Sequence, residues 1–573
     1  MIARFLLTLV AALGLAACAT VQPPAPVSAE RANLLAAPFA KGMVSAADPR
    51  AAEAGAQMLR QGGTATDAAI ATMIALTVVE PQSSGIGGGG FYIRHDGKTG
   101  AIETIDGREK APAGATPEWF LGPDGKPLGY TEAVLSGLSV GVPGNIALAA
   151  EAHKRHGRLP WAKLFAPAIA LAKDGWVLTE RGRDYLERYE ARAIHDPVGK
   201  ALFYDQSGAP LPVGTLVRNP ALATTLERIA LQGPSAFYEG PFAGELAARV
   251  ARETPRAGAM IAADVNAYRA TEREPVCGKY RAYRICGMGP PSSGATTVLA
   301  ILGQLEGFDI ASLGPDSPLA WHLFAESQRL AYADREVFLA DADFIAVPTL
   351  ELIEPDYLSR RGALISPEKR MEQAEPGLAQ PWPDGMEPPE QGTSHLVVVD
   401  RAGNAITYTS TIEGPFGSGL MVGGFYLNNE LTDFSLTPID GGHPVANRVE
   451  GGKRPRSSMA PTLVYDAQGR LVLAVGAAGG STIPVQVARA VMGFIDWNLS
   501  AEEALALPVV FSPGDSIAVE ESAEARALIP GLEAFGHEVS ARRLPIKTNA
   551  IALQQGALAG AADPRSEGAA ISQ

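Results

Sequence analysis

Basic charge, cysteine and metal-binding patterns are all scarce in this 573-residue chain. Lys and Arg together number 48 against 62 Asp and Glu, and the resulting net charge of −14 disfavours general affinity for nucleic acid or anionic lipid surfaces. Only 3 cysteines and 8 histidines are present, without zinc-type spacing or a His-Glu-x-x-His motif. We therefore expect no nucleic-acid partner, no metal and no other cofactor.

The remaining composition is that of a globular protein. Hydrophobic residues make up 46% of the chain and charged residues 19%, and the length allows one large domain or two to four ordinary ones. The 62 glycines and 44 prolines stay below the fraction typical of low-complexity sequence. Glycines are therefore expected at tight turns and at close backbone contacts.

The first residues have the layout of a secretion signal. Arg4 is followed by the apolar run 5–15, which is too short to span a membrane as a mature helix. The sequence Leu-Ala-Ala-Cys18 then resembles a bacterial lipoprotein box, in which cleavage leaves Cys18 as the lipidated first residue; a plain signal peptide is the alternative. We expect a signal at 1–18 and a tether at 19–40. The protein would be exported to the periplasm of a bacterium and held at the outer membrane only by lipid.

Export implies an oxidising compartment, which bears on the other two cysteines. Residues 274–286 have the pattern of a hairpin that turns near Arg281-Ala282. Cys277 and Cys286 would then be cross-strand neighbours, close enough for a disulfide. Two buried free thiols are the alternative, and we favour the bond.

Hydrophobic patterning predicts both helices and strands. The run 64–79 is apolar on nearly every side and predicts a buried helix. Further helices are expected at 49–62, 145–156, 161–174, 220–232, 241–254, 295–305 and 318–339. The glycine run 85–90 precedes a strand at 91–94, so close backbone packing explains it better than a phosphate loop.

A proline-rich stretch ends abruptly at Gly392, and a β-branched run follows. Residues 374–392 form a long loop before this run, whereas the loop before a strand in a compact domain is normally short. One interpretation is that the chain is cut between Gly392 and Thr393. Thr393 would then be an N-terminal residue whose hydroxyl is a nucleophile and whose own α-amine is the base. The other is an ordinary threonine at a strand edge, which this stretch taken alone favours.

Two hairpins follow that junction. Strands 393–399 and 405–411 are joined by a loop centred on Ala402, which places Thr411 opposite Thr393 with Cβ atoms about 5 Å apart. The second hairpin, 461–475, leads to Gly479-Gly480 and a helix at 482–497, with Ser481 as its expected N-cap. The two glycines can expose backbone amides as an oxyanion hole. A Gly-Gly turn without any function is the alternative.

Arg108 follows the strand 101–106 beside Gly107. A strand end is a place where a guanidinium can be presented to a carboxylate. Considered alone, Arg108 is better explained as a solvated surface arginine.

Several short motifs, each weak alone, are together very specific. They are Arg108-Glu-Lys-Ala-Pro112, Thr393-Ser-His395, Thr409-Ser-Thr-Ile412, Leu427-Asn-Asn-Glu-Leu-Thr-Asp-Phe434, Arg454-Pro-Arg-Ser-Ser-Met459, Gly476 to Gly480 and Asp563-Pro-Arg565. Through them, from about residue 42 to residue 566, the chain resembles a gamma-glutamyltranspeptidase, a member of the N-terminal nucleophile hydrolases. The resemblance implies an α+β fold, a four-layer αββα sandwich. It also implies a precursor that cleaves itself between Gly392 and Thr393 into a large subunit, 41–392, and a small catalytic subunit, 393–573, which form one intertwined domain.

The resemblance also implies roles for individual residues. Thr393 would attack a γ-glutamyl amide such as that of glutathione, and the acyl group would pass to water or to an amino acid or peptide acceptor. Thr411 would support the nucleophile, and the Gly479 and Gly480 amides would stabilise the tetrahedral intermediate. The substrate α-carboxylate would be held by Arg108, Ser457 and Ser458, and its α-ammonium by Glu430 and Asp433.

Two features depart from the family pattern. Glu413 stands where the family often has Asn, and a carboxylate there can bind an ammonium or disfavour an anionic acyl group. The segment between Phe434 and Arg454 is short and lacks the lid tyrosine of many relatives, so a more open site is expected.

Two other functions stay open at this point. A same-fold acylase acting on glutaryl or other amides, including β-lactam side chains of the cephalosporin type, needs no ammonium clamp. Glu430 and Asp433 argue against it, while Glu413 leaves it possible. A non-catalytic, lipid-anchored binding protein would not need Thr393, Thr411 or Gly479-Gly480.

Overall fold

The computed structural model of this chain describes residues 39–573 except 380, 389–391 and 555. The expected signal at 1–18, the lipidated Cys18 and nearly all of the tether lie outside the described residues. Within the described part, no helix is both long and apolar enough to cross a membrane. Helices and strands are both abundant, so the fold is α+β.

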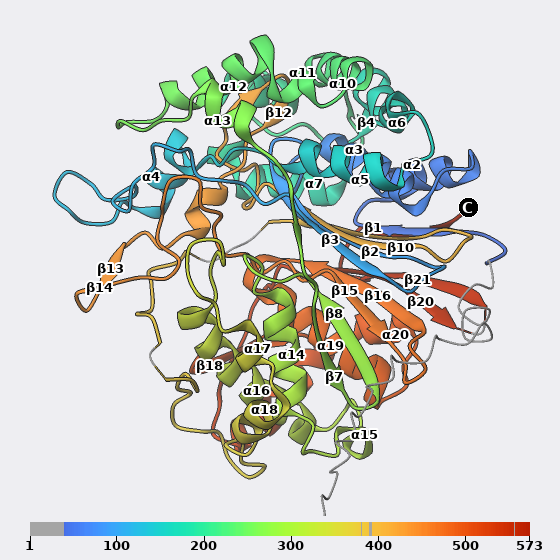
Figure 1. The fold of residues 1–573 in the computed structure, drawn as a ribbon, viewed down its shortest axis with the longest axis vertical. Coiled ribbons are helices and arrows are strands. Elements are labelled where there is room, and N and C mark those ends of the chain that lie inside the picture. Colours follow the sequence, from blue (N-terminus) through green and yellow to red (C-terminus); the bar gives the residue numbers. More distant parts are fainter. Residues whose placement is uncertain (1–38, 380, 389–391, 555) are drawn as a thin grey trace, which may run out of the picture.

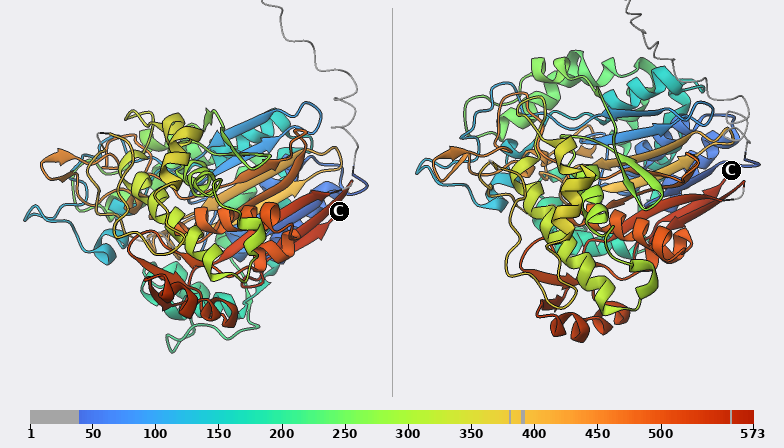
Figure 2. Two further views of the ribbon diagram at one scale, coloured as in Figure 1. Left: turned by 90° about the horizontal axis from the view of Figure 1, so that it is seen from below. Right: turned by 60° about the horizontal axis from the view of Figure 1, so that its bottom comes forward.

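One large sheet contains the segment that follows Gly392. Its strands are β1 (Met43–Ala46), β2 (Gly89–His95), β3 (Ile102–Asp106), β6 (Thr271–Arg273), β9 (Ser394–Val399), β10 (Ala405–Thr411) and β22 (Ala569–Ser572). Their order among the described residues is β22-β1-β9-β10-β2-β3-β6. The antiparallel pair β9 and β10 is therefore central. Figure 2 shows the C-terminal strand next to the N-terminal one, in keeping with the pairing of β1 and β22.

A second sheet faces the first. It consists of β7 (Val276–Tyr280), β8 (Tyr283–Gly287), β15 (Thr462–Tyr465), β16 (Leu471–Ala478), β20 (Lys547–Gln554) and β21 (Ala557–Ala562). The order is β21-β20-β16-β15-β8-β7. Val397 and Val399 of β9 belong to the same buried cluster as Leu473 and Val475 of β16. Because β9 is covered on both faces, its sequence is a continuous apolar run and does not alternate between apolar and polar residues.

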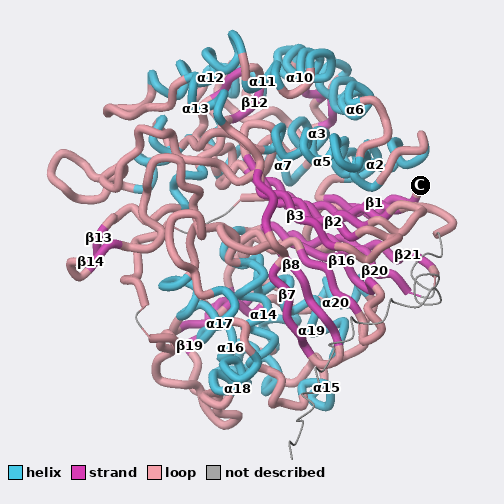
Figure 3. Tube along the Cα trace, viewed as in Figure 1, coloured by secondary structure: helices cyan, strands magenta, loops and turns pink. Residues whose placement is uncertain are grey.

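Helices cover the outer faces of both sheets, and Figure 3 shows the strands as a band between them. The helices over the first sheet are α2 (Pro49–Arg60), α3 (Ala65–Val79), α5 (Asn145–His156) and α6 (Trp161–Asp174). Those over the second sheet are α14 (Gly294–Gln304), α16 (Pro318–Phe338) and α19 (Ile483–Asp496). Every residue of α3 is buried, as its uniformly apolar sequence predicts.

The remaining elements surround these layers. The helices are α4 (Tyr130–Val134), α7 (Glu180–Arg188), α8 (Glu190–Ala193), α9 (Pro197–Phe203), α10 (Pro220–Gln232), α11 (Ser235–Tyr238), α12 (Gly240–Arg252), α13 (Ala262–Ala267), α15 (Ile310–Leu313), α17 (Thr349–Leu352), α18 (Pro355–Gly362), α20 (Ala501–Ala506), α21 (Ala523–Ala527) and α22 (Ile529–Ala534). The short strands are β4 (Trp176–Val177), β5 (Leu216–Val217), β11 (Met421–Val422), β12 (Phe425–Tyr426), β13 (Ile439–Asp440), β14 (His443–Pro444), β17 (Val510–Phe511), β18 (Ser516–Val519) and β19 (Glu538–Ala541).

The glycine run 85–90 packs against β10. A Cβ atom on Gly88 would lie 1.9 Å from the carbonyl oxygen of Thr411, and one on Gly90 would lie 2.4 Å from that of Thr409. Any side chain would collide with the neighbouring backbone, so glycine is required at both positions. The run therefore brings the start of β2 close to the end of β10.

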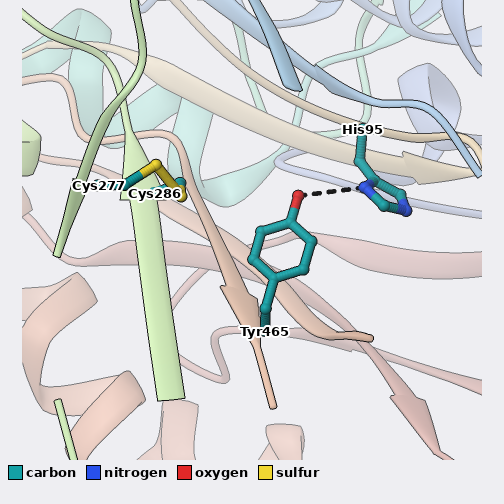
Figure 4. The surroundings of a disulfide bond; sticks show 4 residues. All are labelled: His95, Cys277, Cys286 and Tyr465. Carbon is teal, nitrogen blue, oxygen red and sulfur yellow. Dashed lines mark hydrogen bonds between the residues drawn. A yellow bond between two sulfur atoms is a disulfide. The ribbon is translucent and has the colours of Figure 1, made fainter. Parts of the chain in front are cut away.

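A disulfide joins Cys277 and Cys286, which face each other in the β7–β8 hairpin. The sulfur atoms are 2.09 Å apart and the Cα atoms 4.1 Å apart (Figure 4). In the same region, the Tyr465 hydroxyl of β15 lies 3.1 Å from His95 Nδ1 of β2. That hydrogen bond links the two sheets.

Replacing both cysteines, Cys277→Ser with Cys286→Ser, should lower the free energy of unfolding by about 2 kcal/mol, because the short closed loop would no longer restrict the unfolded chain. Chemical denaturation measures this, with unmodified protein under reducing conditions as the comparison. If neither reduction nor substitution shifts the midpoint, the disulfide does not contribute to stability.

Candidate active site

Thr393 and Thr411 lie side by side at the end of the β9–β10 hairpin. The ladder ends with Ser394 opposite Ser410, so the two threonines are the next pair. The Thr393 hydroxyl donates a hydrogen bond to Thr411 Oγ1 at 3.2 Å, and the Glu413 amide donates to the same oxygen at 2.8 Å. Both threonines are buried. The structure thus brings together the two hydroxyls that the hairpin symmetry predicts.

The peptide bond between Gly392 and Thr393 is held on three sides. The Gly392 carbonyl oxygen accepts a hydrogen bond from the Gly479 amide at 3.2 Å, and the Thr393 amide donates to the Ser83 carbonyl at 3.1 Å. A Cβ atom on Gly392 would lie only 1.5 Å from the Glu413 carbonyl oxygen. Thr393 has φ 104°, in a region that a β-branched residue rarely adopts. The Gly392 carbonyl is therefore already hydrogen-bonded to an amide, that of Gly479, which can stabilise an oxyanion.

The turn after β16 can present amides only because it contains glycines. Gly479 has φ 131° and Gly480 φ 60°, and a Cβ atom on Gly479 would lie 1.9 Å from the Pro545 carbonyl oxygen. The expected N-cap at Ser481 is wrong. Residues Gly480–Thr482 form a 3₁₀ turn, and Thr482 occupies the cap position without a side-chain hydrogen bond. The chain tightens there because Gly479 must face the Gly392 carbonyl.

Arg108 is fully buried beside the threonines and is not a surface arginine. Its guanidinium forms ion pairs with Glu430 and Asp433. It also donates from Nε to the Pro455 carbonyl at 3.2 Å and from Nη2 to the Arg456 carbonyl at 2.8 Å. The cation of the expected substrate clamp therefore lies between its two carboxylates, which outnumber it.

The two serines of the clamp differ in their surroundings. Ser457 lines one small cavity of about 10 Å³ together with Arg108, Thr393, Thr411, Glu413, Glu430, Asp433, Gly392, Met459 and Gly480. Ser458 does not line it, and its hydroxyl accepts a hydrogen bond from Arg335 at 2.6 Å. Gly479 lines a neighbouring cavity. Most of the predicted site residues thus line one of these two cavities, whereas Ser458 lines neither.

Glu413 faces the cavity as a buried carboxylate. It has φ 67° and accepts a hydrogen bond from the Asn429 side chain. The segment between Phe434 and Arg454 contributes no described residue to the cavity lining. Its exposed β13–β14 hairpin projects from the body of the protein in Figure 1. The lining around Thr393 therefore has no contribution from a lid.

Glu109 is a site residue that the sequence reasoning did not assign, although it follows Arg108 in the motif. Its side chain is fully buried, and neither carboxylate oxygen has a hydrogen-bond partner among the described residues. Burial raises the pKa of Glu109 to about 7, against the lowering effect of Arg108. Burial also raises the pKa of Glu430 well above its usual range, and the nearby Glu109 and Glu413 reinforce that shift. Carboxyl groups outnumber Arg108 here, so binding of a proton or of a ligand cation is favoured because it compensates their negative charge.

A buried ion pair supports the residue after Thr393, and no sequence pattern indicated it. The Ser394 hydroxyl donates to Glu80 at 2.5 Å, and Lys547 Nζ donates to the same carboxylate at 2.8 and 3.1 Å. Burial lowers the pKa of Lys547, while Glu80 opposes that shift. Glu80 ends α3 and Lys547 begins β20, so this contact ties the start of β9 in the first sheet to a strand of the second sheet.

Among the described residues, no three His, Cys, Asp or Glu side chains are arranged to hold a metal ion. The described residues bring together a buried hydroxyl at Thr393, a backbone amide at Gly479 that donates to the carbonyl before it, and a charged pocket. These groups fit acyl transfer from an amide.

Comparisons with known proteins agree with this chemistry. The family model described as Gamma-glutamyltranspeptidase matches residues 51–573. A glutathione hydrolase proenzyme of Bacillus subtilis (strain 168) is 37% identical over 549 residues, covering 92% of this chain and 91% of the relative. An acylase ACY 1 proenzyme of Pseudomonas sp. (strain V22) is 36% identical over 543 residues, covering 93% of each. Among solved structures, a cephalosporin acylase from Bacillus halodurans has a TM-score of 0.79 at 26% identity, covering 96% of this chain and 98% of that one.

The buried carboxyl of Glu109 should make stability depend on pH. Its pKa of about 7 exceeds the ordinary value of 4.5, so between these values the folded protein keeps a proton that the unfolded chain has lost. This contribution to stability is complete below pH 4.5 and is lost as the pH rises through 7. Glu109→Gln should remove this part of the decline, on the order of 1 to 3 kcal/mol. Denaturant unfolding on both sides of this range measures it, with exposed Glu502→Gln as the control. An unchanged slope in Glu109→Gln would contradict the assignment.

Proposed function

The chain belongs to the gamma-glutamyltranspeptidase family, and from that premise we propose that it is a gamma-glutamyltransferase and glutathione hydrolase whose nucleophile is Thr393. The fold class proposed with it is the four-layer αββα sandwich of the N-terminal nucleophile hydrolases. One observation carries the assignment: Thr393 Oγ1 lies 3.2 Å from Thr411 Oγ1 while the carbonyl before Thr393 accepts a hydrogen bond from Gly479.

The first reaction is cleavage of the chain itself. Thr393 Oγ1 attacks the Gly392 carbonyl carbon, and the developing oxyanion stays on the Gly479 amide. The C–N bond then breaks, the hydroxyl proton ends on the Thr393 nitrogen, and an ester joins Gly392 to Thr393. Water hydrolyses the ester, which leaves Gly392 with a carboxylate and Thr393 with a free amine and hydroxyl. Residues 41–392 and 393–573 become the large and small subunits.

The same groups then act on the donor. An N-terminal amine has an ordinary pKa of about 7.7–8.0, so the Thr393 amine can accept the hydroxyl proton near neutral pH. Thr393 Oγ1 forms an ester with the γ-carbonyl, and the leaving amine takes the proton. Water or the amine of an amino acid or peptide then attacks this ester and regenerates Thr393. Thr411 orients the hydroxyl, and the Gly479 and Gly480 amides receive the oxyanion.

The charged pocket suits an amino-acid head group. The α-carboxylate of a γ-glutamyl donor would bind Arg108 and the serines at 457 and 458, while its α-ammonium would bind Glu430 and Asp433. Because Arg108 already pairs with both carboxylates, a zwitterionic group can enter by exchange without leaving any buried charge unpaired. Glu413 adds a further carboxylate beside the ammonium position.

An acylase is the second candidate, because the chain is also similar to named acylases. A glutaryl group carries a carboxylate but no ammonium, so it would add negative charge to a pocket that already holds Glu413, Glu430 and Asp433 around one arginine. This charge balance favours the γ-glutamyl donor.

Gly392→Ala should block maturation, because the added Cβ would collide with the Glu413 carbonyl at 1.5 Å and displace the scissile bond. The purified variant should run as one band on a denaturing gel, whereas the unmodified protein gives two. Gly244→Ala is the matched control, since a Cβ at Gly244 of α12 meets no atom within 4 Å. Normal cleavage of Gly392→Ala would refute the proposed geometry.

Asp433→Asn should separate the two candidate activities. Loss of one carboxylate weakens the ammonium clamp, so KM for a γ-glutamyl anilide should rise about tenfold or more while KM for a glutaryl anilide stays within about twofold. The measurement compares both anilides on fully cleaved enzyme, because an uncut variant would lose both activities. Equal effects on the two donors would favour the acylase.

A further inference from the structure

A cluster of charged side chains near the candidate active site has no role in the function proposed above. Arg456 precedes Ser457 in the chain, and its side chain is only 1% exposed. Its guanidinium forms ion pairs with Glu336 of α16 and with Glu387. Glu336 also binds Arg335 at 2.5 Å. The cluster thus joins two arginines to two carboxylates, and its charges balance only while Glu387 is in place.

Glu387 belongs to the proline-rich stretch that ends at the scissile bond. It lies five residues before Gly392, and its side chain is 16% exposed. The backbone beside it docks on the same surface. The Met386 amide donates a hydrogen bond to the Ser435 hydroxyl at 2.9 Å, and the Met386 carbonyl accepts one from the Leu436 amide at 2.9 Å. The chain is therefore held at two successive residues shortly before it reaches Gly392.

The contacts of the Glu387 carboxylate fix its orientation as well as its position. Besides the guanidinium of Arg456, it is bound by the side-chain amide of Asn447 at 2.8 Å. The oxygen of the Asn447 side chain accepts from the Arg456 amide at 3.0 Å, and its nitrogen also donates to the Asp433 carbonyl at 2.7 Å. Charge-assisted hydrogen bonds of this kind are stronger than neutral ones, so an uncharged group at position 387 would be held less firmly.

The scissile bond needs such an anchor because the backbone around it is strained. Thr393 has φ 104°, and a conformation of this kind persists only where the surrounding structure holds it. On one side, β9 begins at Ser394 and fixes the chain after the bond. On the other side, Met386 and Glu387 fix the chain before it. The strained bond therefore lies between two anchored segments.

We propose that the ion pair between Glu387 and Arg456 is a latch that positions the scissile bond for self-cleavage, and that Glu387 is a positioning residue for this step alone. The inference rests on the proposed function, because it concerns the first reaction of the same site. Glu387 is not among the residues that line the small cavity beside Thr393. Turnover of a donor by the cleaved enzyme should therefore not need the latch.

The rate of self-cleavage tests this proposal. The precursor is made by cell-free translation, and the loss of the uncut band is followed on denaturing gels. Glu387→Gln keeps the size of the side chain but removes its charge, so cleavage should slow at least about threefold. Glu375→Gln is the matched control, because Glu375 is an exposed glutamate of the same proline-rich stretch, and its rate should not change. Once fully cut, all three proteins should turn over γ-glutamyl para-nitroanilide at rates within about twofold of one another.

The pH profile of cleavage separates the latch from a general effect on the fold. Burial raises the pKa of Glu387 to about 7, against the lowering effect of Arg456, and Glu336 adds to the rise. The groups that face this carboxyl are Arg456, Glu336, Arg335 and Asn447. Below about pH 6 the unmodified protein carries a protonated Glu387, which a glutamine resembles, so the two cleavage rates should converge. Above about pH 8 the carboxylate is ionised, and the rates should differ most.

Two results would overturn the latch and leave the proposed function intact. One is equal cleavage of Glu387→Gln and the unmodified protein at every pH. The other is slower cleavage of Glu387→Gln by a factor that does not change with pH, which would indicate a purely structural defect. If the unmodified protein were never cut, the proposed function would fall and the latch with it.

Discussion

The structure depends on one steric constraint, the close contact between Gly392 and the Glu413 carbonyl. No side chain fits at position 392, because its Cβ would lie 1.5 Å from that oxygen. The contact fixes the peptide bond so that its carbonyl meets the Gly479 amide and its Thr393 hydroxyl meets Thr411. Three distant segments, namely Gly392, the end of β10 and the turn before α19, thereby meet at the Gly392 carbonyl.

Buried charge is the second determinant, and under the proposed function it selects the acyl group. Arg108 faces Glu430 and Asp433, and Glu109 and Glu413 add carboxyl groups nearby. Burying so many carboxyl groups is costly unless protons or cations compensate them, which explains why the pKa values of Glu109 and Glu430 are raised. A ligand ammonium supplies the missing positive charge. The same charge balance disfavours a purely anionic acyl group. We therefore propose that the excess of carboxyl groups selects against donors that lack an ammonium.

Local patterns in the sequence predicted the elements that carry the chemistry. The loop centred on Ala402 sets the pairing of Thr393 with Thr411, and the turn near Arg281 sets that of Cys277 with Cys286. These succeed because a hairpin register follows from its own residues. The burial of Arg108 against Glu430 and the Glu80–Lys547 pair could not be predicted, because each joins segments far apart in the chain. Ser481 failed as a helix cap because the turn must serve Gly392.

The role of Thr393 as nucleophile can be tested by trapping the acylated enzyme and locating its acyl group. A γ-glutamyl donor is mixed with the mature protein, the reaction is quenched in acid, and the digested peptides are examined by mass spectrometry. We expect one γ-glutamyl group on the peptide that begins at Thr393, with a free Gly392 carboxylate ending the large subunit. An acyl group on any other residue, or a Thr393 still joined to Gly392 in an active enzyme, would contradict it.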